Sequence, residues 1–343
     1  MTETIAHPLR REGSMEETMQ DTMKAIAQDR YGSPDVLTLR EVARPEIGED
    51  GVLVRVRAAS VNALDWHFLR GEPYVLRLSE GLRRPKTAIR GVDVAGTVEA
   101  VGAAVTEFRA GDEVFGIRDG SLAEFVAGRE SSFAHKPASL TFEQAAAVPV
   151  AGETALQGLR DRGQLKAGQK VLVYGAGGGV GTFAVQIAKA LGADVTAVTS
   201  PAKADLVGSI GADRVIDYTR DDFTRGEDRY DVILDVGANR SLTDLRRALV
   251  PGGILVLAGG AKGRWIGPLL RPLLGALRAR AGGKRTVPFL SDHRKEDLLV
   301  LKDMLEAGSI RPVIDRTYPL AEAGEAIRYL ETGQTRGKVV VAV

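Results

Sequence analysis

A glycine-rich turn constrains this chain more than any other feature of its sequence. The turn, GAGGGVG, lies between an apolar stretch at 170–174 and a stretch at 180–191 whose apolar residues recur at helical spacing. Ala176 stands where the common dinucleotide pattern has its first glycine, whereas Gly178 and Gly181 keep its second and third. We expect free N–H groups at the start of the helix to hold the pyrophosphate of a dinucleotide. The predicted contacts are Gly175, Ala176, Gly178, Gly179, Val180 and Gly181.

Strand-like and helix-like segments alternate around this turn. The strand-like segments are 170–174, 194–200, 214–218, 230–236 and 252–260, and helix-like segments lie between them at 180–192, 201–211 and 241–249. The strand-like segments are apolar along their length, which is typical of a parallel sheet that helices cover on both faces. This context makes the glycine turn a strong signal and predicts an α/β, doubly wound Rossmann domain over 150–307.

The chain before this domain has a different periodicity. From Lys24 to about residue 135, short apolar or alternating stretches are separated by Gly and Pro, which indicates a mainly β domain. Helical spacing begins near 141, where Thr141 and Gln144 form a capping box. We therefore expect a disordered extension over 1–23 and a β domain over 24–149. The segment 308–343 reads as strand, helix and strand, and is expected to return to that first domain.

The second strand-like segment indicates which dinucleotide binds. An NAD site usually has Asp or Glu at this point to hold the ribose 2′-OH, but here the segment ends in Ser200 without an acid. Lys203 follows three residues later, and Tyr218 follows the third strand. A hydroxyl and a cation suit a 2′-phosphate, so these three residues predict NADPH. A capping role for Ser200 and a solvated position for Lys203 remain open.

Composition removes several other classes of site. The chain has no Cys, which excludes disulfides, thiolate zinc sites and Cys nucleophiles, and its four widely separated His residues argue against any metal site. G-x-S-x-G is absent, and the glycines before Lys338 do not have Walker-loop spacing. A formal net charge of +1 gives no global attraction to nucleic acid.

Two further stretches bear on location and partners. The N-terminal residues lack the apolar stretch of a signal peptide, and the chain contains no apolar run of about 18 residues, so we expect a cytoplasmic protein. The segment 261–285 holds seven basic residues, no acidic one and many leucines. It is either a weak contact with a membrane or a partner protein, or an amphipathic excursion that packs on the protein itself.

With these features in hand, the chain resembles the medium-chain dehydrogenase/reductase superfamily, in particular its zinc-free, quinone-oxidoreductase-like branch. The resemblance covers about residues 24–343. Its blocks are ASVNALDWHFLRG (59–71), GVDVAGTVEAVG (91–102), GDEVFG (111–116), AAAVPVAGETAL (145–156), the glycine turn, GADRVIDY (211–218) and RGKVVVAV (336–343). It implies a GroES-like β domain into which a Rossmann domain of strand order 3-2-1-4-5-6 is inserted, with the active site in the cleft between them.

Departures from the family pattern are informative too. Zinc alcohol dehydrogenases of this superfamily carry Cys where Asn62 stands, and a His-Glu pair where Val92 and Asp93 stand. Many also carry a lobe with four Cys, which a chain without Cys cannot form. The resemblance therefore implies zinc-independent chemistry.

The resemblance also implies site residues. Asn62 would lie near the nicotinamide ribose or the substrate, and Asp65 shares its motif. Trp66 stands where related quinone reductases often have Tyr, so Tyr74 is the nearest phenol. A turn role for Asn62 and a packing role for Tyr74 remain open. Further contacts to the cofactor are expected from Thr154, Val236, Gly237, Ala258, Gly259, Gly260 and Lys338.

Together these features predict an NADPH-dependent reductase that transfers hydride to a small apolar acceptor: a quinone, an enone or another activated alkene or carbonyl. A zinc-free alcohol or aldehyde dehydrogenase is the second reading. An NADPH-binding regulatory or membrane-associated protein of the same fold is the third. A homodimer through the sheet edge near 285–290 is common in similar proteins and is expected here.

Overall fold

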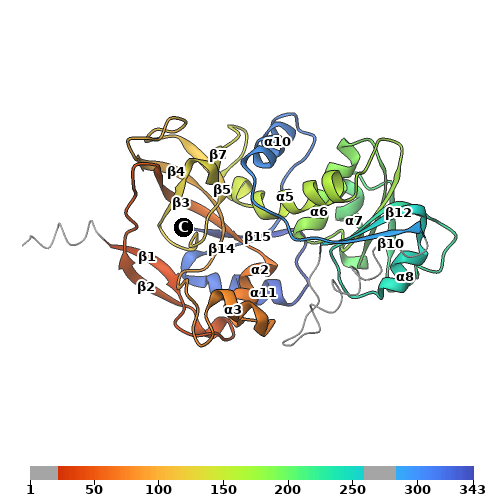
Figure 1. Cartoon of the computed structure of the whole chain (residues 1–343), viewed down its shortest axis with the longest axis horizontal. Helices are drawn as coiled ribbons and strands as arrows, with labels where there is room; N and C mark the ends of the chain where they lie inside the picture. The colour runs from red at the N-terminus through yellow and green to blue at the C-terminus, as the bar shows by residue number, and fades with distance from the viewer. Residues whose placement is uncertain (1–21, 259–282) are drawn as a thin grey trace, which may run out of the picture.

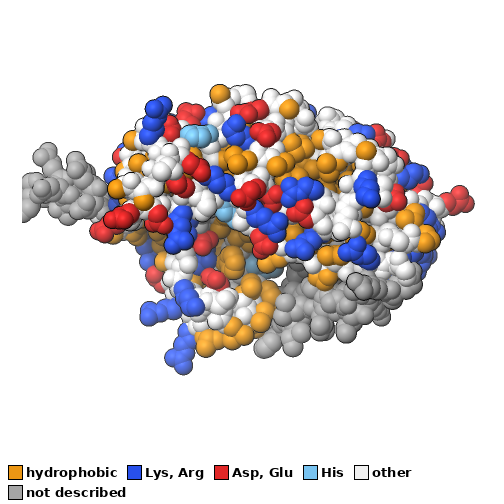
Figure 2. All heavy atoms as spheres, turned by 45° about the horizontal axis from the view of Figure 1, so that its top comes forward, with side chains coloured by type: hydrophobic (Ala, Val, Ile, Leu, Met, Phe, Trp, Pro, Cys, Tyr) orange, Lys and Arg blue, Asp and Glu red, His pale blue; other side chains and the backbone are white. Residues whose placement is uncertain are grey.

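The structure is a computed structural model that describes residues 22–258 and 283–343. Two large sheets organise most of these residues, and Figure 1 shows them side by side, with the Rossmann half in green to teal on the right. The N-terminal half lies on the left, and the blue C-terminal strands lie within it. None of the described helices is long and apolar enough to cross a membrane. Figure 2 shows acidic and basic side chains interspersed over one face.

The Rossmann sheet is parallel throughout and confirms the predicted doubly wound fold. Within the described residues its order is β10-β9-β8-β11-β12-β13, which is 3-2-1-4-5-6 when its strands are numbered along the chain. The strands are β8 (Lys170–Tyr174), β9 (Asp194–Thr199), β10 (Arg214–Asp217), β11 (Tyr230–Asp235), β12 (Leu249–Leu257) and β13 (Arg285–Pro288). Within the described part of the chain, β13 is the edge strand of this sheet and contains part of the segment 285–290, through which a homodimer is predicted. The homodimer stays a prediction.

Alternate residues of β8 explain why helices cover both faces of this sheet. Val171 and Val173 belong to one buried core and Leu172 and Tyr174 to another, because successive side chains of a strand point to opposite faces. The helices of this half are α5 (Pro149–Gln157), α6 (Gly179–Ala190), α7 (Ala204–Ser209), α8 (Leu242–Arg247) and α10 (Lys295–Glu306). α5, α6 and α10 share the first core, and α8 shares the second.

The GroES-like sheet receives the end of the chain. Its order is β14-β15-β3-β4-β5-β7, with β6 also paired to β3. The strands are β3 (Gly51–Val61), β4 (Asp93–Val101), β5 (Glu113–Ile117), β6 (Phe125–Arg129), β7 (Phe133–His135), β14 (Ile314–Pro319) and β15 (Lys338–Ala342), and β1 (Thr22–Ala27) pairs with β2 (Thr38–Ala43). The last strand, β15, runs antiparallel to β3, so the segment 308–343 returns to this half. Its helices are α2 (Ala63–Arg70), α3 (Arg77–Glu80), α4 (Phe142–Ala146) and α11 (Ala323–Glu331).

Two expected boundaries are corrected. β1 begins at Thr22, so the last two residues assigned to the extension over 1–23 are strand, and residues 1–21 lie outside the description. The expected helical stretch from residue 141 is divided. Thr141 and Gln144 do form the capping box, but α4 ends at Ala146 and α5 begins at Pro149. Proline favours a helix start because it has no N–H to donate inside a helix.

The close approach of α6 to β8 depends on Gly181. A Cβ at this position would lie 2.2 Å from the carbonyl oxygen of Gly175 and 2.6 Å from Cα of Ala176, both backbone atoms that cannot move aside. Gly208, near the end of α7, is the contrasting case, because a Cβ there would have nothing within 4 Å.

We therefore predict opposite effects for two matched substitutions. Gly181→Ala should lower the free energy of unfolding by about 3 kcal/mol, since it overpacks a fixed backbone. Gly208→Ala should raise it by about 0.5 kcal/mol, because alanine favours a helix. Urea denaturation of both variants measures this, and a Gly181→Ala protein as stable as the unaltered one would contradict it.

Candidate active site

A cavity of about 810 Å³ lies between the two halves. The glycine turn and the ends of β8 and β9 line one side of it. The start of α2 and the segment 332–338 line the other. The predicted residues that line it are Asn62, Gly175, Gly178, Gly179, Val180, Ser200, Lys203, Tyr218, Val236, Gly237 and Lys338. The structure thus brings together residues from both halves, as a cleft between two domains requires.

The glycine turn has the geometry of a phosphate cradle. Gly175 has φ of 90°, a left-handed backbone that side chains disfavour, and its N–H donates to the carbonyl of Val198 at 3.1 Å. Gly178 caps the twelve-residue helix α6 with extended backbone. A Cβ on Gly178 would have its nearest neighbour, the carbonyl oxygen of Gly175, at an ordinary contact distance of 3.7 Å, and Gly178 lines the cavity. The N–H groups that open α6 fit the pyrophosphate of a dinucleotide.

A cationic region of the cavity lies beside the glycine turn, because a Cβ on Gly177 would be 2.6 Å from Cδ of Lys203. Ser200 precedes a short 3₁₀ turn (Pro201–Lys203) but makes no side-chain capping bond, so the capping alternative for its hydroxyl is not seen. Lys203 donates to the carbonyl of Gly333 at 3.1 Å across the cavity, and burial lowers the pKa of its ammonium. Arg316 and Arg336 also line the cavity. Sequence reasoning missed both arginines, although Arg336 opens the quoted block RGKVVVAV.

Lys338 lies at the floor of the cavity within a buried polar network. Its ammonium donates to Oδ1 of Asn62 at 2.5 Å and to Oδ2 of Asp93 at 3.1 Å. Nδ2 of Asn62 donates to the same Asp93 oxygen at 2.8 Å, and the Ser60 hydroxyl does so at 2.6 Å. Sequence reasoning found Asn62 and Lys338 but missed Asp93 and Ser60 as their partners.

Asp65 faces away from this cavity. Its carboxylate accepts the backbone N–H of Asn62 at 2.7 Å, which completes the capping box of α2. It lines a separate hollow of about 90 Å³ beside Arg90. Burial raises the pKa of the Asp65 carboxyl to about 7. Asp65 therefore fixes the backbone that carries Asn62, whereas Trp66 from the same helix does line the cavity.

The other predicted residues that the structure describes lie outside the cavity lining. Tyr74 begins a 3₁₀ turn (Tyr74–Leu76), and the guanidinium of Arg77 lies 4.6 Å from its ring centroid. The Thr154 hydroxyl donates to the carbonyl of Val150 at 2.7 Å. Ala176 and Gly181 lie beneath the turn, and Ala258 follows β12. Gly259, Gly260 and most of the segment 261–285 lie outside the described residues.

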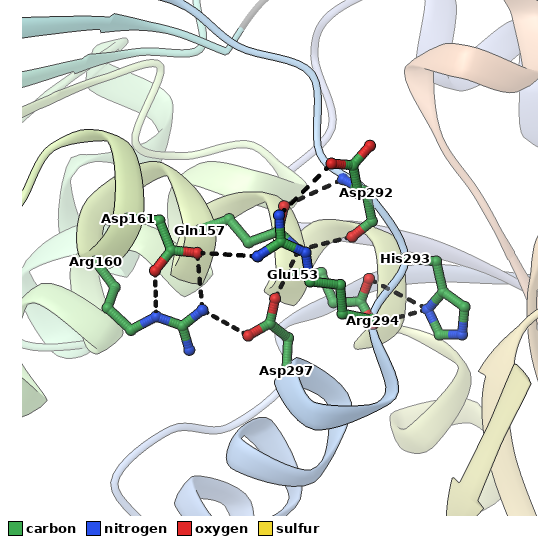
Figure 3. A network of polar contacts seen from close by, with 8 residues as sticks. All are labelled: Glu153, Gln157, Arg160, Asp161, Asp292, His293, Arg294 and Asp297. Atoms are coloured by element: carbon green, nitrogen blue, oxygen red, sulfur yellow. Dashed lines mark hydrogen bonds and ion pairs between the residues drawn. The ribbon is translucent and has the colours of Figure 1, made fainter. Parts of the chain in front are cut away.

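A second polar network joins α5 to the segment before α10, as Figure 3 shows. Nδ1 of His293 lies 3.0 Å from the buried carboxylate of Glu153, and Nε2 lies 3.1 Å from the carbonyl of Ser131 in the first half. Burial raises the pKa of Glu153. Burial also opposes the charged form of His293, but the Glu153 carboxylate outweighs this and leaves the imidazole pKa raised. The network holds α5 against both halves of the molecule.

Comparisons with known proteins agree with this arrangement. A family model described as zinc-binding dehydrogenase matches residues 210–341, and one described as alcohol dehydrogenase GroES-like domain matches 48–139. The chain is 37% identical to 2-methylene-furan-3-one reductase of Solanum lycopersicum over 93% of this chain and 79% of that protein. It is 35% identical to quinone oxidoreductase of Pseudomonas aeruginosa over 93% of this chain and 99% of that protein. This chain belongs to the medium-chain dehydrogenase/reductase superfamily.

Solved structures show that the match extends to the quinone-oxidoreductase-like branch of this superfamily. The quinone oxidoreductase from Coxiella burnetii superposes with a TM-score of 0.84 at 31% identity, covering 94% of this chain and 99% of that one. The Escherichia coli quinone oxidoreductase complexed with NADPH gives 0.81 at 26% identity, covering 93% and 100%. The chain is therefore a nicotinamide-dependent oxidoreductase of this superfamily.

The donors present do not fit the zinc ion that one family description mentions. Where zinc enzymes of the superfamily carry Cys and a His-Glu pair, this chain has Asn62, Val92 and Asp93. Among the described residues, no three His, Cys, Asp or Glu gather closely enough to hold a metal ion. Asp93 instead accepts hydrogen bonds from Ser60, Asn62 and Lys338.

The raised pKa of Asp65 predicts a pH effect on stability. The folded protein favours the protonated carboxyl, so this stabilisation is complete below about pH 4 and is lost as pH rises through about 7. Asp65→Asn is neutral at every pH and keeps an oxygen for the N–H of Asn62. From pH 5 to pH 8, its free energy of unfolding should therefore rise by about 2 kcal/mol relative to the unaltered protein.

Urea denaturation at both pH values measures this difference. Asp205→Asn, which changes an exposed carboxylate on α7, is the control and should follow the unaltered protein. A constant difference between Asp65→Asn and the unaltered protein at both pH values would contradict the prediction.

Proposed function

We propose that this protein is a zinc-independent, NADPH-dependent reductase that transfers hydride to an apolar quinone, enone or related activated alkene. One observation carries the cofactor assignment. The described residues that line the cavity include four cationic side chains and no carboxylate. The cationic side chains are those of Lys203, Arg316, Arg336 and Lys338. A positive cavity with a phosphate cradle suits a ligand with a pyrophosphate and a third phosphate.

The region around Ser200 supports NADPH over NADH. Ser200, Lys203 and Tyr218 come from the loops after β9 and β10, and Arg336 comes from the other half of the molecule. A hydroxyl, a phenol and two cations can bind a 2′-phosphate through charge-assisted hydrogen bonds. An NAD site would instead place a carboxylate near the end of β9.

Relatives support the acceptor class. One is named NADPH-dependent alkenal/one oxidoreductase, of Arabidopsis thaliana, and is 35% identical over 93% of this chain and 79% of that protein. The names of the other relatives include a furanone reductase and a quinone oxidoreductase. Enones and quinones share an electrophilic carbon conjugated to a carbonyl oxygen. The indole of Trp66 gives the cavity wall an apolar surface that suits such an acceptor.

The chain's own groups would bind and polarise the acceptor. A bound reduced nicotinamide supplies the hydride. Asn62 and Lys338 line the floor of the cavity and carry hydrogen-bond donors that can stabilise negative charge on the acceptor oxygen. Placement of the acceptor between the two halves would also exclude water from the reacting atoms. A zinc ion is not needed where such donors are already fixed.

The reaction class predicts a specific activity profile. NADPH oxidation, followed by absorbance with a metal chelator present, should be fastest with quinones and enones and slow with simple aldehydes. Purified protein that oxidises NADPH with none of these acceptors would favour a regulatory NADPH-binding protein. Activity that the chelator abolishes and zinc restores would contradict the metal-free mechanism.

Cofactor preference has its own test. Lys203→Glu should weaken NADPH binding by about 10- to 100-fold, the range expected when a cation that pairs with a phosphate is reversed. NADH binding should change by less than about threefold, because NADH has no 2′-phosphate. Quenching of protein fluorescence by each cofactor measures both constants. Lys166→Glu, an exposed residue before β8, is the matched control and should change neither. Tighter binding of NADH by the unaltered protein would contradict the assignment.

A further inference from the structure

Asp93 is the centre of the buried network at the cavity floor. It is the first residue of β4 and is fully buried. Oδ2 accepts from the Ser60 hydroxyl, from Nδ2 of Asn62 and from the Lys338 ammonium. Oδ1 accepts the backbone N–H of Val150 at 2.9 Å, at the start of α5. The carboxylate thus joins β3, β15 and α5, yet it does not itself line the cavity.

The chemistry of these partners fixes the side-chain amide of Asn62. An ammonium can only donate and a carboxylate can only accept, so Oδ1 must face Lys338 and Nδ2 must face Asp93. The opposite orientation would place the NH₂ group against the ammonium and the carbonyl oxygen against the carboxylate. Nδ2 carries a second hydrogen, and Asn62 lines the cavity. Asp93 therefore determines that this amide can offer a donor to a bound molecule.

Asp93 also keeps the Lys338 charge in place. This side chain is 2% exposed, and an ammonium buried this far requires a counter-charge. The stem of Lys338 lies against the glycine turn, because a Cβ on Gly179 would be 2.8 Å from its Cδ. Nζ also donates to the carbonyl oxygen of Val61 at 3.5 Å, which is long for a hydrogen bond. An acceptor oxygen in the cavity could replace this long bond.

We propose that Asp93 is a positioning residue for hydride transfer, which holds the Lys338 ammonium and the Asn62 amide as a fixed pair of donors for the acceptor oxygen. This inference rests on the proposed function. When the electrophilic carbon accepts a hydride, an electron pair of the conjugated system moves to the carbonyl oxygen, which later takes a proton from water. Fixed donors stabilise that charge as it develops.

The first test is Asp93→Asn in the full-length protein. The variant should lower kcat by about 100-fold, the effect of losing preorganised donors for an oxyanion. Its dissociation constant for NADPH should change by less than about threefold, since the proposed 2′-phosphate site and the phosphate cradle are intact. Stopped-flow NADPH oxidation and fluorescence quenching measure the two quantities. A folded variant whose kcat is within threefold of the unaltered value would overturn the inference.

A double variant separates positioning from stability. In the double variant, Asp93→Asn is combined with Lys338→Met, so that both charges of the buried pair are removed and no uncompensated ammonium remains. The double variant should recover most of the melting temperature that Asp93→Asn loses, but kcat should stay low. Recovery of kcat in the double variant would show that the donor pair is unnecessary and would overturn the inference.

Asp297→Asn is the matched control for the loss of a buried carboxylate. Asp297 is nearly as buried and pairs with Arg160 at 2.6 Å in the network of Figure 3, outside the cavity lining. This variant should lose stability while its kcat remains within about twofold. An equal fall in kcat for Asp297→Asn and Asp93→Asn would show a general loss of packing and overturn the inference.

The pH profile gives a readout that a purely structural role would not change. A buried ammonium that has lost its carboxylate gives up its proton more readily, so activity of Asp93→Asn should begin to fall at a lower pH than that of the unaltered protein. Asp65, Glu153 and His293 also interact electrostatically with Asp93. The comparison is therefore between the two profiles, and coincident profiles would contradict the inference.

The unaltered protein distinguishes the two proposals. If it reduces quinones or enones and Asp93→Asn does so equally well, only the inference fails. If the unaltered protein reduces no acceptor, the proposed function fails and the inference fails with it.

Discussion

The buried ion pair between Lys338 and Asp93 is the interaction on which the site depends. The two residues are 245 positions apart, and both are removed from water. Such a pair stabilises little by itself, because desolvation offsets most of the attraction, but removal of one member leaves an uncompensated charge. The pair therefore acts mainly as a constraint on register. In the observed register of β15 beside β3, Lys338 meets both Asp93 and Asn62.

This constraint also brings the two halves of the molecule together. The residue before Lys338, Gly337, donates its N–H to the carbonyl of Gly177 at 3.1 Å, so the end of the chain touches the glycine turn. Lys203, which also lines the cavity, donates to the carbonyl of Gly333. One short segment, 333–338, thus closes the cleft at two points, and the charges it contributes to the lining are positive.

The sequence was sufficient for those features that local patterns encode. Strand and helix periodicity predicted the Rossmann sheet, and the missing acid after β9 led to Ser200, Lys203 and Tyr218, which do line the cavity. Asp93 and Arg336 were missed because their roles depend on segments that meet only in the folded chain. The same reason explains why Asp65 and Thr154 do not line the cavity, although the motifs that contain them suggested a place in the site. The structure uses Asp65 to cap α2, and it engages the Thr154 hydroxyl with the Val150 carbonyl.

Helix α5 connects the two polar networks, and this connection bears on how rigid the site is. Its first turn gives the Val150 N–H to Asp93, while Glu153 one turn later meets His293, which in turn reaches Ser131 of the first half. Lys295, just beyond His293, pairs with Glu107 of that half. Hydrogen bonds and ion pairs therefore join the two halves of the molecule beside α5 as well as along the segment 333–338. Contacts on two sides of the cleft favour a cavity that is formed before ligands bind. The Asn62 amide and the Lys338 ammonium at its floor then need little reorganisation.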